Sequence, residues 1–403
     1  ITINQQKTIF DGWKSISISL YMSLAGYAVL VGVPVISTAW VNLLGFSEIE
    51  VGRVAGADLG GLSAGALVAA MLIAKINRRL LIIISALTAM LANGLCIFIV
   101  DYENVLWLRL IAGFGSGIYT AVAVATLGAT SNPARAFNMM LFFFAFSQGL
   151  EMYFLPKLSM SGIYIVFIFT YAISLIFIKW LPPHPITKNQ DNNKNTVQDS
   201  SSDKITKHKI PTYVPWLVIL AIVATYTNIG AYWTYIEIAS ANSEFSIANQ
   251  ELVSWVLTAA SFFSLVGCLF ATLLSNRFGL ARPLLITLII HASIVAMLAN
   301  GITDLKIILS VFMFNTLWIF IDVYQMSTIA NVDKTGRFAS LLPAAQGLGQ
   351  IIGPNLAASI LAAGLGYSGL FIMCACASLT GMLIYAFMYI RLRKTIPSLA
   401  DAS

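Results

Sequence analysis

Charged side chains are rare in this sequence. Asp, Glu, Lys and Arg together make up 10% of its 403 residues, whereas an ordinary soluble domain carries roughly 25%. Hydrophobic residues make up 58% of the chain, and the mean hydropathy is +0.83. A chain of this composition cannot cover its surface with polar groups, so a water-soluble fold is excluded and a membrane protein is indicated.

Residues that hold metals or attack substrates are equally scarce. The chain has four cysteines and three histidines, and no cysteine stands at metal-site spacing with a histidine. The absence of a phosphate-binding P-loop argues against a pump driven by ATP on this chain, and no HExxH or GxSxG motif supports an enzyme. The sequence therefore predicts no metal, no cofactor, no catalytic residue and no nucleic-acid partner.

Long apolar runs stand where charge is missing. A helix needs roughly 20 mostly apolar residues to cross a bilayer, and twelve stretches reach that length. They are 14–40, 48–73, 80–100, 104–128, 136–156, 161–181, 213–238, 249–274, 283–302, 305–329, 338–362 and 368–391. Ser47 and Glu50 predict a capping box at the start of the second stretch.

A polar segment separates the first six spans from the last six. Residues 182–212 contain several prolines and almost no large apolar side chains, so they cannot bury enough surface to fold alone and are predicted to be a flexible linker. The predicted fold is an all-α membrane protein in two pseudo-symmetric six-helix bundles. Its units are 1–181, the linker 182–212, and 213–403.

Basic residues indicate the orientation of the spans. Cytoplasmic loops carry an excess of Lys and Arg. With a cytoplasmic N-terminus, 19 of the 23 basic residues are cytoplasmic, Arg53, Lys157 and Lys306 are outside, and Arg109 lies within a span. Both termini and the linker are therefore predicted to be cytoplasmic, in a multi-pass protein of the cell (inner or plasma) membrane.

The two halves repeat each other. The segment Ser147–Pro156 in span five matches Ala345–Pro354 in span eleven, with Gln-Gly-Leu and the proline both recurring at an offset of 198. A parallel repeat of six helices is a known transporter plan, with the substrate site between the halves near the midplane.

Two motifs resemble those of the major facilitator superfamily. Span four contains its R-x-x-x-G-x-G-x-G pattern as Arg109, Gly113, Gly115 and Gly117. The loop motif G-x-x-x-D-R-x-G-R-R/K has counterparts in both halves, each lacking the aspartate. The second-half copy comprises Thr272, Asn276, Arg277, Phe278, Gly279 and Arg282, and the first-half copy Ala70, Ala74, Lys75, Asn77, Arg78 and Arg79. The resemblance implies twelve transmembrane helices, alternating access and, commonly, proton coupling.

Span ten places an acid on a polar face. Ionisable residues inside a span are costly and usually face a cavity. Asn315, Trp318, Asp322 and Gln325 are spaced along one face of a helix. Asp322 is interpreted as a proton carrier or ligand contact, or alternatively as a hydrogen bond that only packs two helices.

Other polar residues in the spans have open interpretations. Arg109 is a candidate gating residue or charge partner, or a structural tie. Asp58 could pair with Arg109, take up protons or serve structure. Glu151 is a protonation site or a residue reaching the interface, and Glu237 is expected to reach outside water. His291 is expected to make a hydrogen bond between helices. Candidate cavity residues besides the span-ten face are Tyr226, Trp233, Gln148, Gln346 and Gln350.

These features predict a proton-coupled secondary transporter that moves a small organic solute by alternating access as a functional monomer. Acids outnumber bases in the spans, which favours a neutral or cationic solute, although Arg109 keeps an organic anion possible. Export by proton antiport is favoured. The span-five antiporter motif of drug exporters is absent, however, and G-x-x-x-G-P occurs instead as Gly349–Pro354 in span eleven. The alternative is an importer coupled to protons, and a remote one is a transport-inactive sensor or scaffold.

Overall fold

The computed structural model describes residues 8–183, 210–274, 278–279, 281–332, 338 and 341–395. Within these ranges the structure is helical, and its β-type pairing is a single bridge between Ser246 and Ile302. Most of the predicted linker, 184–209, lies outside the described residues, as do Asn276 and Arg277 of the second loop motif.

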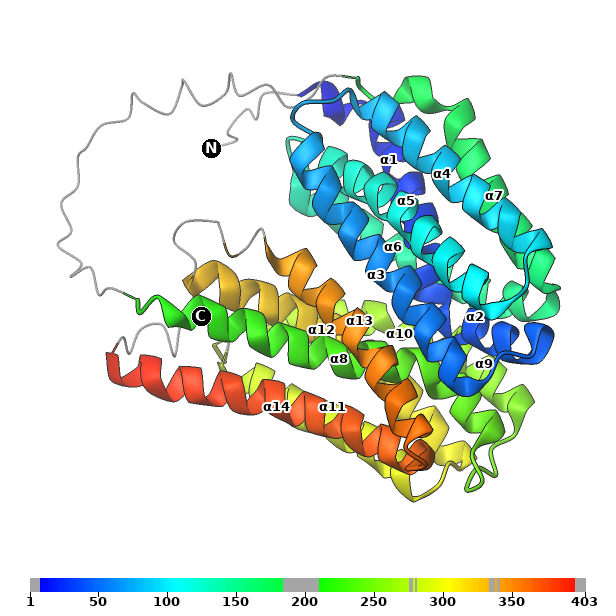
Figure 1. Cartoon of the computed structure of the whole chain (residues 1–403). Coiled ribbons are helices and arrows are strands. Elements are labelled where there is room, and N and C mark those ends of the chain that lie inside the picture. Colours follow the sequence, from blue (N-terminus) through cyan, green and yellow to red (C-terminus); the bar gives the residue numbers. More distant parts are fainter. Residues whose placement is uncertain are drawn as a thin grey trace, which may run out of the picture.

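The first half of the chain forms the N-terminal bundle, at the upper right of Figure 1. Its helices are α1 (Trp13–Gly26), α2 (Ala28–Leu44), α3 (Glu48–Leu72), α4 (Arg78–Phe98), α5 (Tyr102–Gly128), α6 (Pro133–Phe154) and α7 (Met160–Ile176). Short 3-10 turns lie at Ile9–Asp11, Leu155–Lys157 and Ile178–Trp180. Helix α5 packs against α1, α3 and α4, so it forms the centre of this bundle.

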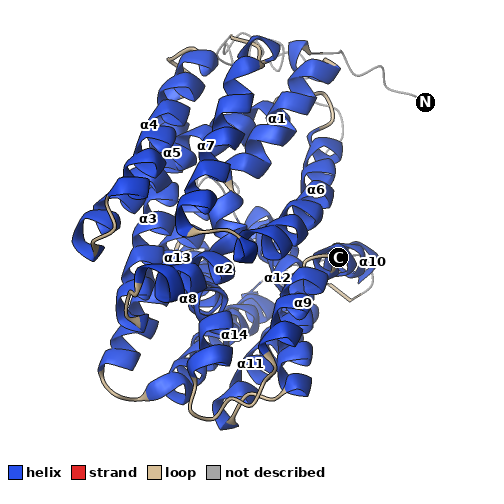
Figure 2. Cartoon of the chain, turned by 90° about the vertical axis from the view of Figure 1, so that its right-hand side faces the viewer, coloured by secondary structure: helices blue, strands red, loops and turns tan. Residues whose placement is uncertain are grey.

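The second half forms the C-terminal bundle, which lies below the first in Figures 1 and 2. Its helices are α8 (Tyr213–Asn242), α9 (Gln250–Ala260), α10 (Phe263–Leu274), α11 (Ala281–Ala296), α12 (Asp304–Val332), α13 (Leu342–Ala362) and α14 (Gly366–Thr395), with a 3-10 turn at Met297–Asn300. Helix α8 packs against α13 and α14 and also contacts α2 of the other bundle.

The helices correspond to the twelve predicted spans, and the predicted fold class is confirmed. Ten segments of the described chain are long and apolar enough to cross a membrane, and α7 is a shorter apolar helix. The first span is broken at Tyr27 into α1 and α2, and the eighth is divided into α9 and α10. Helix α13 begins at Leu342, later than predicted, because Pro343 occupies a first-turn position that favours proline.

The predicted capping box at the start of α3 is confirmed. The Ser47 hydroxyl accepts a hydrogen bond from the Glu50 backbone N–H at 3.2 Å, and the Glu50 carboxylate accepts one from the Ser47 backbone N–H at 2.9 Å. This box satisfies two backbone donors that a helix start otherwise leaves free.

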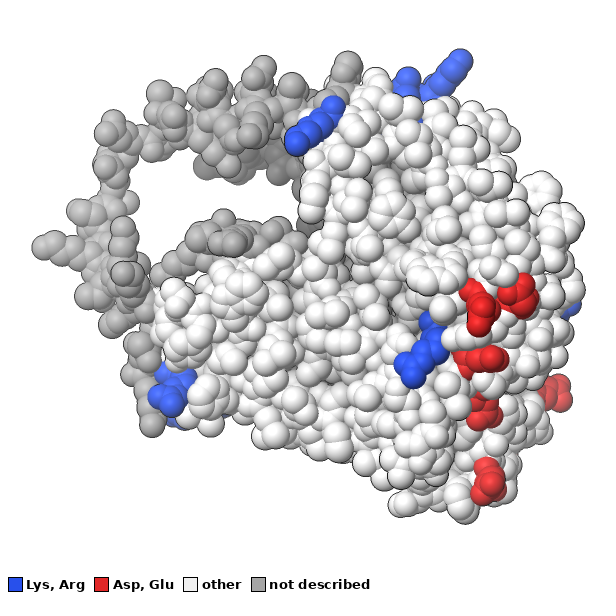
Figure 3. Space-filling model, in the orientation of Figure 1, with Lys and Arg blue, Asp and Glu red and all other residues white. Residues whose placement is uncertain are grey.

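The two ends of the molecule differ in charge, and we name them the acidic end and the basic end. The acidic end carries Glu48, Glu50, Asp101, Glu103, Glu251 and Asp304 near the starts of α3, α5, α9 and α12. The basic end carries Lys14, Lys75, Arg78, Arg79, Arg135, Lys179, Arg391 and Arg393. In Figure 3 the acidic side chains gather on one side of the molecule, away from most of the basic ones.

Glycines let α5 approach α3 and α4 at backbone distance. A Cβ on Gly113 would meet the backbone of Asp58, one on Gly117 would meet the backbone of Leu62, and one on Gly115 would lie 2.8 Å from the Ser85 carbonyl oxygen. The span-four motif is therefore a packing surface that seats the backbone of two neighbouring helices.

Replacing Gly113 with alanine is expected to destabilise the protein by about 1–3 kcal/mol, because the new methyl group meets backbone that cannot move aside. Gly94→Ala in α4 is the matched control. The nearest atom to a Cβ added at Gly94 is 3.9 Å away, which is an ordinary contact distance, and alanine is a better helix former than glycine by about 1 kcal/mol. Thermal unfolding in detergent should show a lower Tm for Gly113→Ala alone. Equal Tm values would contradict the packing role.

Candidate functional site

A buried ion pair joins α3 to α5. Arg109 donates from Nε to Asp58 Oδ2 at 2.7 Å, and its Nη2 lies 2.6 Å from the same oxygen. Its Nη1 donates to Asn93 Oδ1 on α4 at 2.7 Å. Asp58 is 2% exposed and Arg109 is 1% exposed, so the pair lies inside the N-terminal bundle and away from water.

The surroundings of this pair explain how a guanidinium is held there. The Arg109 guanidinium carbon lies 5.5 Å from the ring centre of Tyr164 on α7, and the Tyr164 hydroxyl accepts a hydrogen bond from Trp40 Nε1 at 3.1 Å. Because Gly113 brings α5 against the Asp58 backbone, the carboxylate comes within reach of Arg109 one helical turn away. The span-four motif thus determines both the close packing of α5 on α3 and the position of the Arg109 charge.

Asp322 on α12 has a neutral partner. The Tyr226 hydroxyl on α8 donates to Asp322 Oδ1 at 2.5 Å. Asp322 is partly exposed, Tyr226 is buried, and no described Lys, Arg or His forms an ion pair with this aspartate. Unlike Asp58, Asp322 is therefore a carboxyl in the membrane region whose charge is not balanced by a cation of the described residues.

An amide pair near Asp322 connects the two bundles. Gln148 on α6 donates from Nε2 to Asn315 Oδ1 on α12 at 3.1 Å, and both side chains are buried. Asn315 also donates to the Val311 carbonyl at 3.0 Å within its own helix. The bond places two predicted cavity residues from opposite bundles in direct contact.

Tryptophans stand beside this amide pair. The rings of Trp318 and Trp233 lie 6.0 Å apart, and Phe314 contacts both at 6.0–6.1 Å. Trp318 is partly exposed, whereas Trp233 is 2% exposed and its Nε1 has no hydrogen-bond partner among the described residues. Trp318 therefore forms the outer surface of this aromatic cluster and Trp233 supports it from within.

The remaining predicted cavity residues separate into two groups. Gln346 on α13 is partly exposed, and Gln350 is 5% exposed with its Cα packed against Gly230 of α8. Gln325 is fully buried and donates to the Thr225 hydroxyl at 3.0 Å inside the C-terminal bundle. Gln325 and Asp322, which lie on the predicted helix face, thus bond to neighbouring residues of α8, Thr225 and Tyr226.

Two glutamates near the acidic end each have a buried carboxyl oxygen without a partner in the described chain, Oε2 in both cases. The other oxygen of Glu151 accepts from the Ser147 hydroxyl at 3.3 Å, and its Oε2 lies 2.7 Å from where a Cβ on Gly32 of α2 would stand. Glu237 on α8 contacts the Thr38 hydroxyl of α2. The side chain of Glu237 is partly exposed, in keeping with the expectation that it reaches water, whereas its Oε2 is buried.

The expectation for His291 is confirmed. His291 on α11 is fully buried, and its Nδ1 lies 3.0 Å from Asn228 Nδ2 on α8. The imidazole also stacks on Phe314 with ring centres 4.7 Å apart. This hydrogen bond therefore joins two helices of the C-terminal bundle.

The two bundles are held together at the acidic end. Arg53 on α3 donates to the carbonyl and to Oδ1 of Asn355, both at 2.9 Å, and to the Ser359 hydroxyl at 3.0 Å. The Tyr235 hydroxyl on α8 donates to the Glu48 carbonyl at 2.6 Å. Helices α3, α8 and α13 thus close this end.

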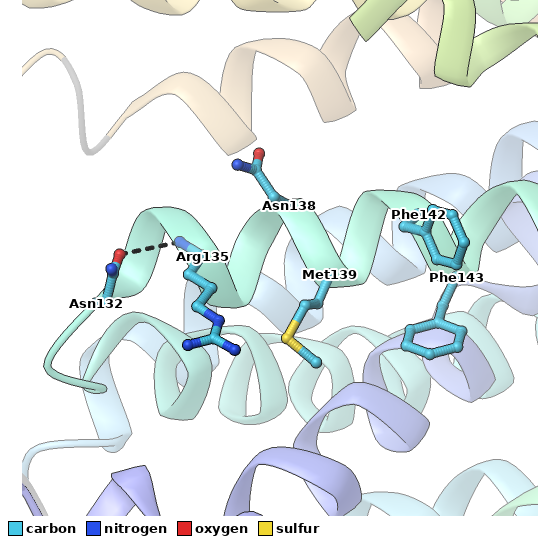
Figure 4. Close-up of a pocket in the computed structure, with 6 residues that line it drawn as sticks. All are labelled: Asn132, Arg135, Asn138, Met139, Phe142 and Phe143. Atoms are coloured by element: carbon cyan, nitrogen blue, oxygen red, sulfur yellow. Dashed lines mark hydrogen bonds between the residues drawn. The ribbon is translucent and has the colours of Figure 1, made fainter. Parts of the chain in front are cut away.

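A cavity lies along α6 toward the basic end. Its volume is about 620 Å³, and it is lined by Asn132, Arg135, Asn138, Met139, Phe142 and Phe143. In Figure 4 Asn138 points from α6 toward the helix drawn above it, and Arg135 and Met139 point the other way. Nearer the acidic end α6 contacts the other bundle, with ring centres of Phe146 and Phe262 5.3 Å apart. The bundles therefore touch at the acidic end, and α6 is uncovered at the basic end.

Sequence reasoning missed this cavity. Arg135 was counted only as a basic residue of a loop, and Asn138 was not singled out. The sequence carried little signal for it, because Arg135 and Asn138 stand at a spacing typical of one helix face and yet point in opposite directions from α6.

The fold and these sites define a membrane transporter built from two six-helix bundles. Residues 16–333 match the sequence profile of the Major Facilitator Superfamily, and the chain belongs to that family. No curated protein sequence matches the chain.

Solved transporters share the fold. The nucleoside transporter NupG is 12% identical, with a TM-score of 0.69 over 93% of this chain and 99% of its own. The D-xylose-proton symporter is 13% identical, with a TM-score of 0.69 over 97% and 99%. A bacterial homologue of the human lysosomal transporter Spinster, solved inward-facing and unoccupied, is 11% identical, with a TM-score of 0.69 over 98% and 99%.

Proposed function

We propose that this transporter is driven by protons and moves a small organic solute by alternating access. The observation that supports this most directly is the Asp322 carboxyl, which is bonded to the neutral Tyr226 hydroxyl at 2.5 Å and has no cation partner in the described chain. A charged carboxylate within a span costs several kcal/mol, and uptake of a proton removes that charge. Asp322 is therefore assigned the proton-carrying role.

The other predicted acids receive different roles. The Asp58 carboxylate is bound by Arg109 at 2.6–2.7 Å and shielded from water, so we assign this pair to holding α3 on α5 rather than to carrying protons. Glu151 lacks a cation in the described chain and remains a secondary proton site. Gln148, Asn315, Trp318 and Gln346 are the proposed solute contacts.

The basic end is assigned to the cytoplasm of the cell (inner or plasma) membrane, following the bias of Lys and Arg toward that side. The contacts at the acidic end then close the outer side. The cavity along α6 opens toward the cytoplasm. In this arrangement the uncovered face of α6 is turned toward the cytoplasm, which suits the loading step of an exporter.

Export by exchange with protons is the direction we propose, for a neutral or cationic solute that an aspartate and partly exposed aromatic and amide groups can hold. Proton symport into the cell is the alternative, and the fold shared with a D-xylose-proton symporter favours it. A transport-inactive scaffold on the same fold is the third possibility.

Flux measurements on purified protein in proteoliposomes test the proposal, after a thermal-shift screen has identified a solute. With one coupled proton, a pH difference of one unit should drive about tenfold accumulation of the solute. The solute should accumulate on the acidic side for antiport and on the alkaline side for symport. A protonophore should abolish the accumulation. A scaffold would show no flux that depends on the gradient, which would contradict the proposal.

A further inference from the structure

Glu237 stands where the two bundles meet at the acidic end. It lies on α8 two residues after Tyr235, whose hydroxyl bonds to the Glu48 carbonyl of the other bundle at 2.6 Å. Its own carboxyl contacts Thr38 of α2, which also belongs to the other bundle. Glu237 Oε2 is buried and has no hydrogen-bond partner among the described residues. One oxygen of a partly exposed carboxyl is thus buried where the bundles meet.

No positive charge of the described chain balances this carboxyl. At the acidic end, the charged groups on the elements around it are Glu48, Glu50 and Arg53 on α3, Glu251 on α9, Asp304 and Lys306 on α12, Glu151 on α6 and Lys157 in the turn after α6. Asp58 and Asp322 lie farther along α3 and α12. None of them forms an ion pair with Glu237, and the Arg53 guanidinium is bonded to Asn355 and Ser359. Most of these groups are acids, so they oppose a negative charge on Glu237.

Opening of the acidic end would change the surroundings of Glu237 Oε2. Alternating access requires α2 and α8 to separate there, and their separation would expose this second oxygen to water as well, in which the charged carboxyl is better solvated. Closing the contact again would remove that water. The charged form therefore favours the open contact and the protonated form favours the closed one.

We propose that Glu237 is a second proton-binding site, located in the acidic-end gate, whose protonation permits the α2–α8 contact to close. This inference rests on the proposed proton-driven function and adds to it a proton that acts on the gate rather than at the solute site. Protonation of Glu237 on the acidic side would accompany each return to the closed state.

A cysteine reporter can measure the gate without any solute. Ala358 on α13 is buried and packs closely against Gly52 on α3 of the other bundle, where a Cβ added to the glycine would lie 2.9 Å from the Ala358 Cβ. A cysteine at position 358 therefore becomes accessible only when the acidic end opens. The experiment uses Ala358→Cys in a chain whose four native cysteines are replaced. A membrane-impermeant maleimide is applied from the acidic side at pH 5 to 9. Because the thiolate is the reacting form of cysteine, labelling is expressed relative to the rate for the same cysteine in the unfolded chain at the same pH.

Labelling should rise with pH while Glu237 is present, by at most about tenfold per pH unit for one titrating carboxyl. Glu237→Gln mimics the protonated form and should label slowly at every pH. Glu237→Asp keeps a carboxyl and should keep a pH dependence. Glu244→Gln, an exposed acid on the same side, is the matched control and should behave as the parent chain.

Two results would overturn the inference: labelling independent of pH in the parent chain, or the parental pH dependence in Glu237→Gln. The parent-chain result needs no Glu237 variant, so it holds even if one fails to fold. Labelling is also independent of flux. Proton-driven flux with a gate insensitive to Glu237 would refute this inference alone, and a Glu237-dependent gate without proton-driven flux would refute the proposed function alone.

Discussion

Replacing Asp322 with asparagine is expected to abolish accumulation driven by a pH gradient while exchange of solute between the two sides continues. Asparagine keeps the shape of the side chain and can accept the Tyr226 hydrogen bond, but it cannot gain or lose a proton. With one coupled proton and one pH unit, the accumulation lost is about tenfold. Uptake in proteoliposomes with and without the gradient, and counterflow without it, measure the two activities.

Two controls separate loss of the proton site from general damage. Tyr226→Phe removes the hydroxyl but leaves the carboxyl, so accumulation should persist with a changed pH profile. Asp304→Asn alters an exposed aspartate at the start of the same helix and should accumulate solute normally. Normal accumulation in Asp322→Asn would take the coupling role away from this residue, whatever its effect on affinity.

Much of the fold could be predicted because a membrane fixes the length and polarity of its helices. Twenty apolar residues are a strong signal, and the twelve spans correspond to the helices of the structure. The Ser47–Glu50 capping box and the His291 hydrogen bond also followed from local pattern. The break at Tyr27 did not, because Trp13–Leu44 is one continuous apolar segment that runs through it.

The site was predicted less completely, because helical periodicity gives the face of a residue but not the neighbour that covers it. Asp322 and Gln325 share a face, yet Gln325 bonds to Thr225 inside its own bundle. Glu237 looks solvent-accessible from its place near a span end and is partly exposed, but its place in the sequence does not show that its Oε2 is buried. Pairing of Asp58 with Arg109, 51 residues away, was one of the predicted alternatives and is confirmed, but the sequence could not choose it because the packing of α3 on α5 brings the two together.

Replacing Arg109 with alanine is expected to cause the largest loss of stability of any change considered. It leaves the Asp58 carboxylate buried without its cation, which costs about 3–5 kcal/mol, and it frees Asn93 Oδ1 as well. Arg109→Lys keeps the charge but cannot donate to Asp58 and Asn93 with the planar geometry of a guanidinium. The stability of this variant should therefore lie between that of Arg109→Ala and that of the parent chain. Thermal unfolding of the purified variants measures this order.

The double variant Arg109→Ala with Asp58→Ala decides what the pair is for. It removes both charges, so it should recover part of the stability lost in Arg109→Ala, and no recovery would show that the two residues are not coupled. Both helices belong to one bundle, so the pair need not break when the bundles move. If it is a structural tie, flux per folded molecule should return with stability in the double variant. If flux stays lost in a stable double variant, Arg109 acts in gating and our structural assignment of the pair is wrong.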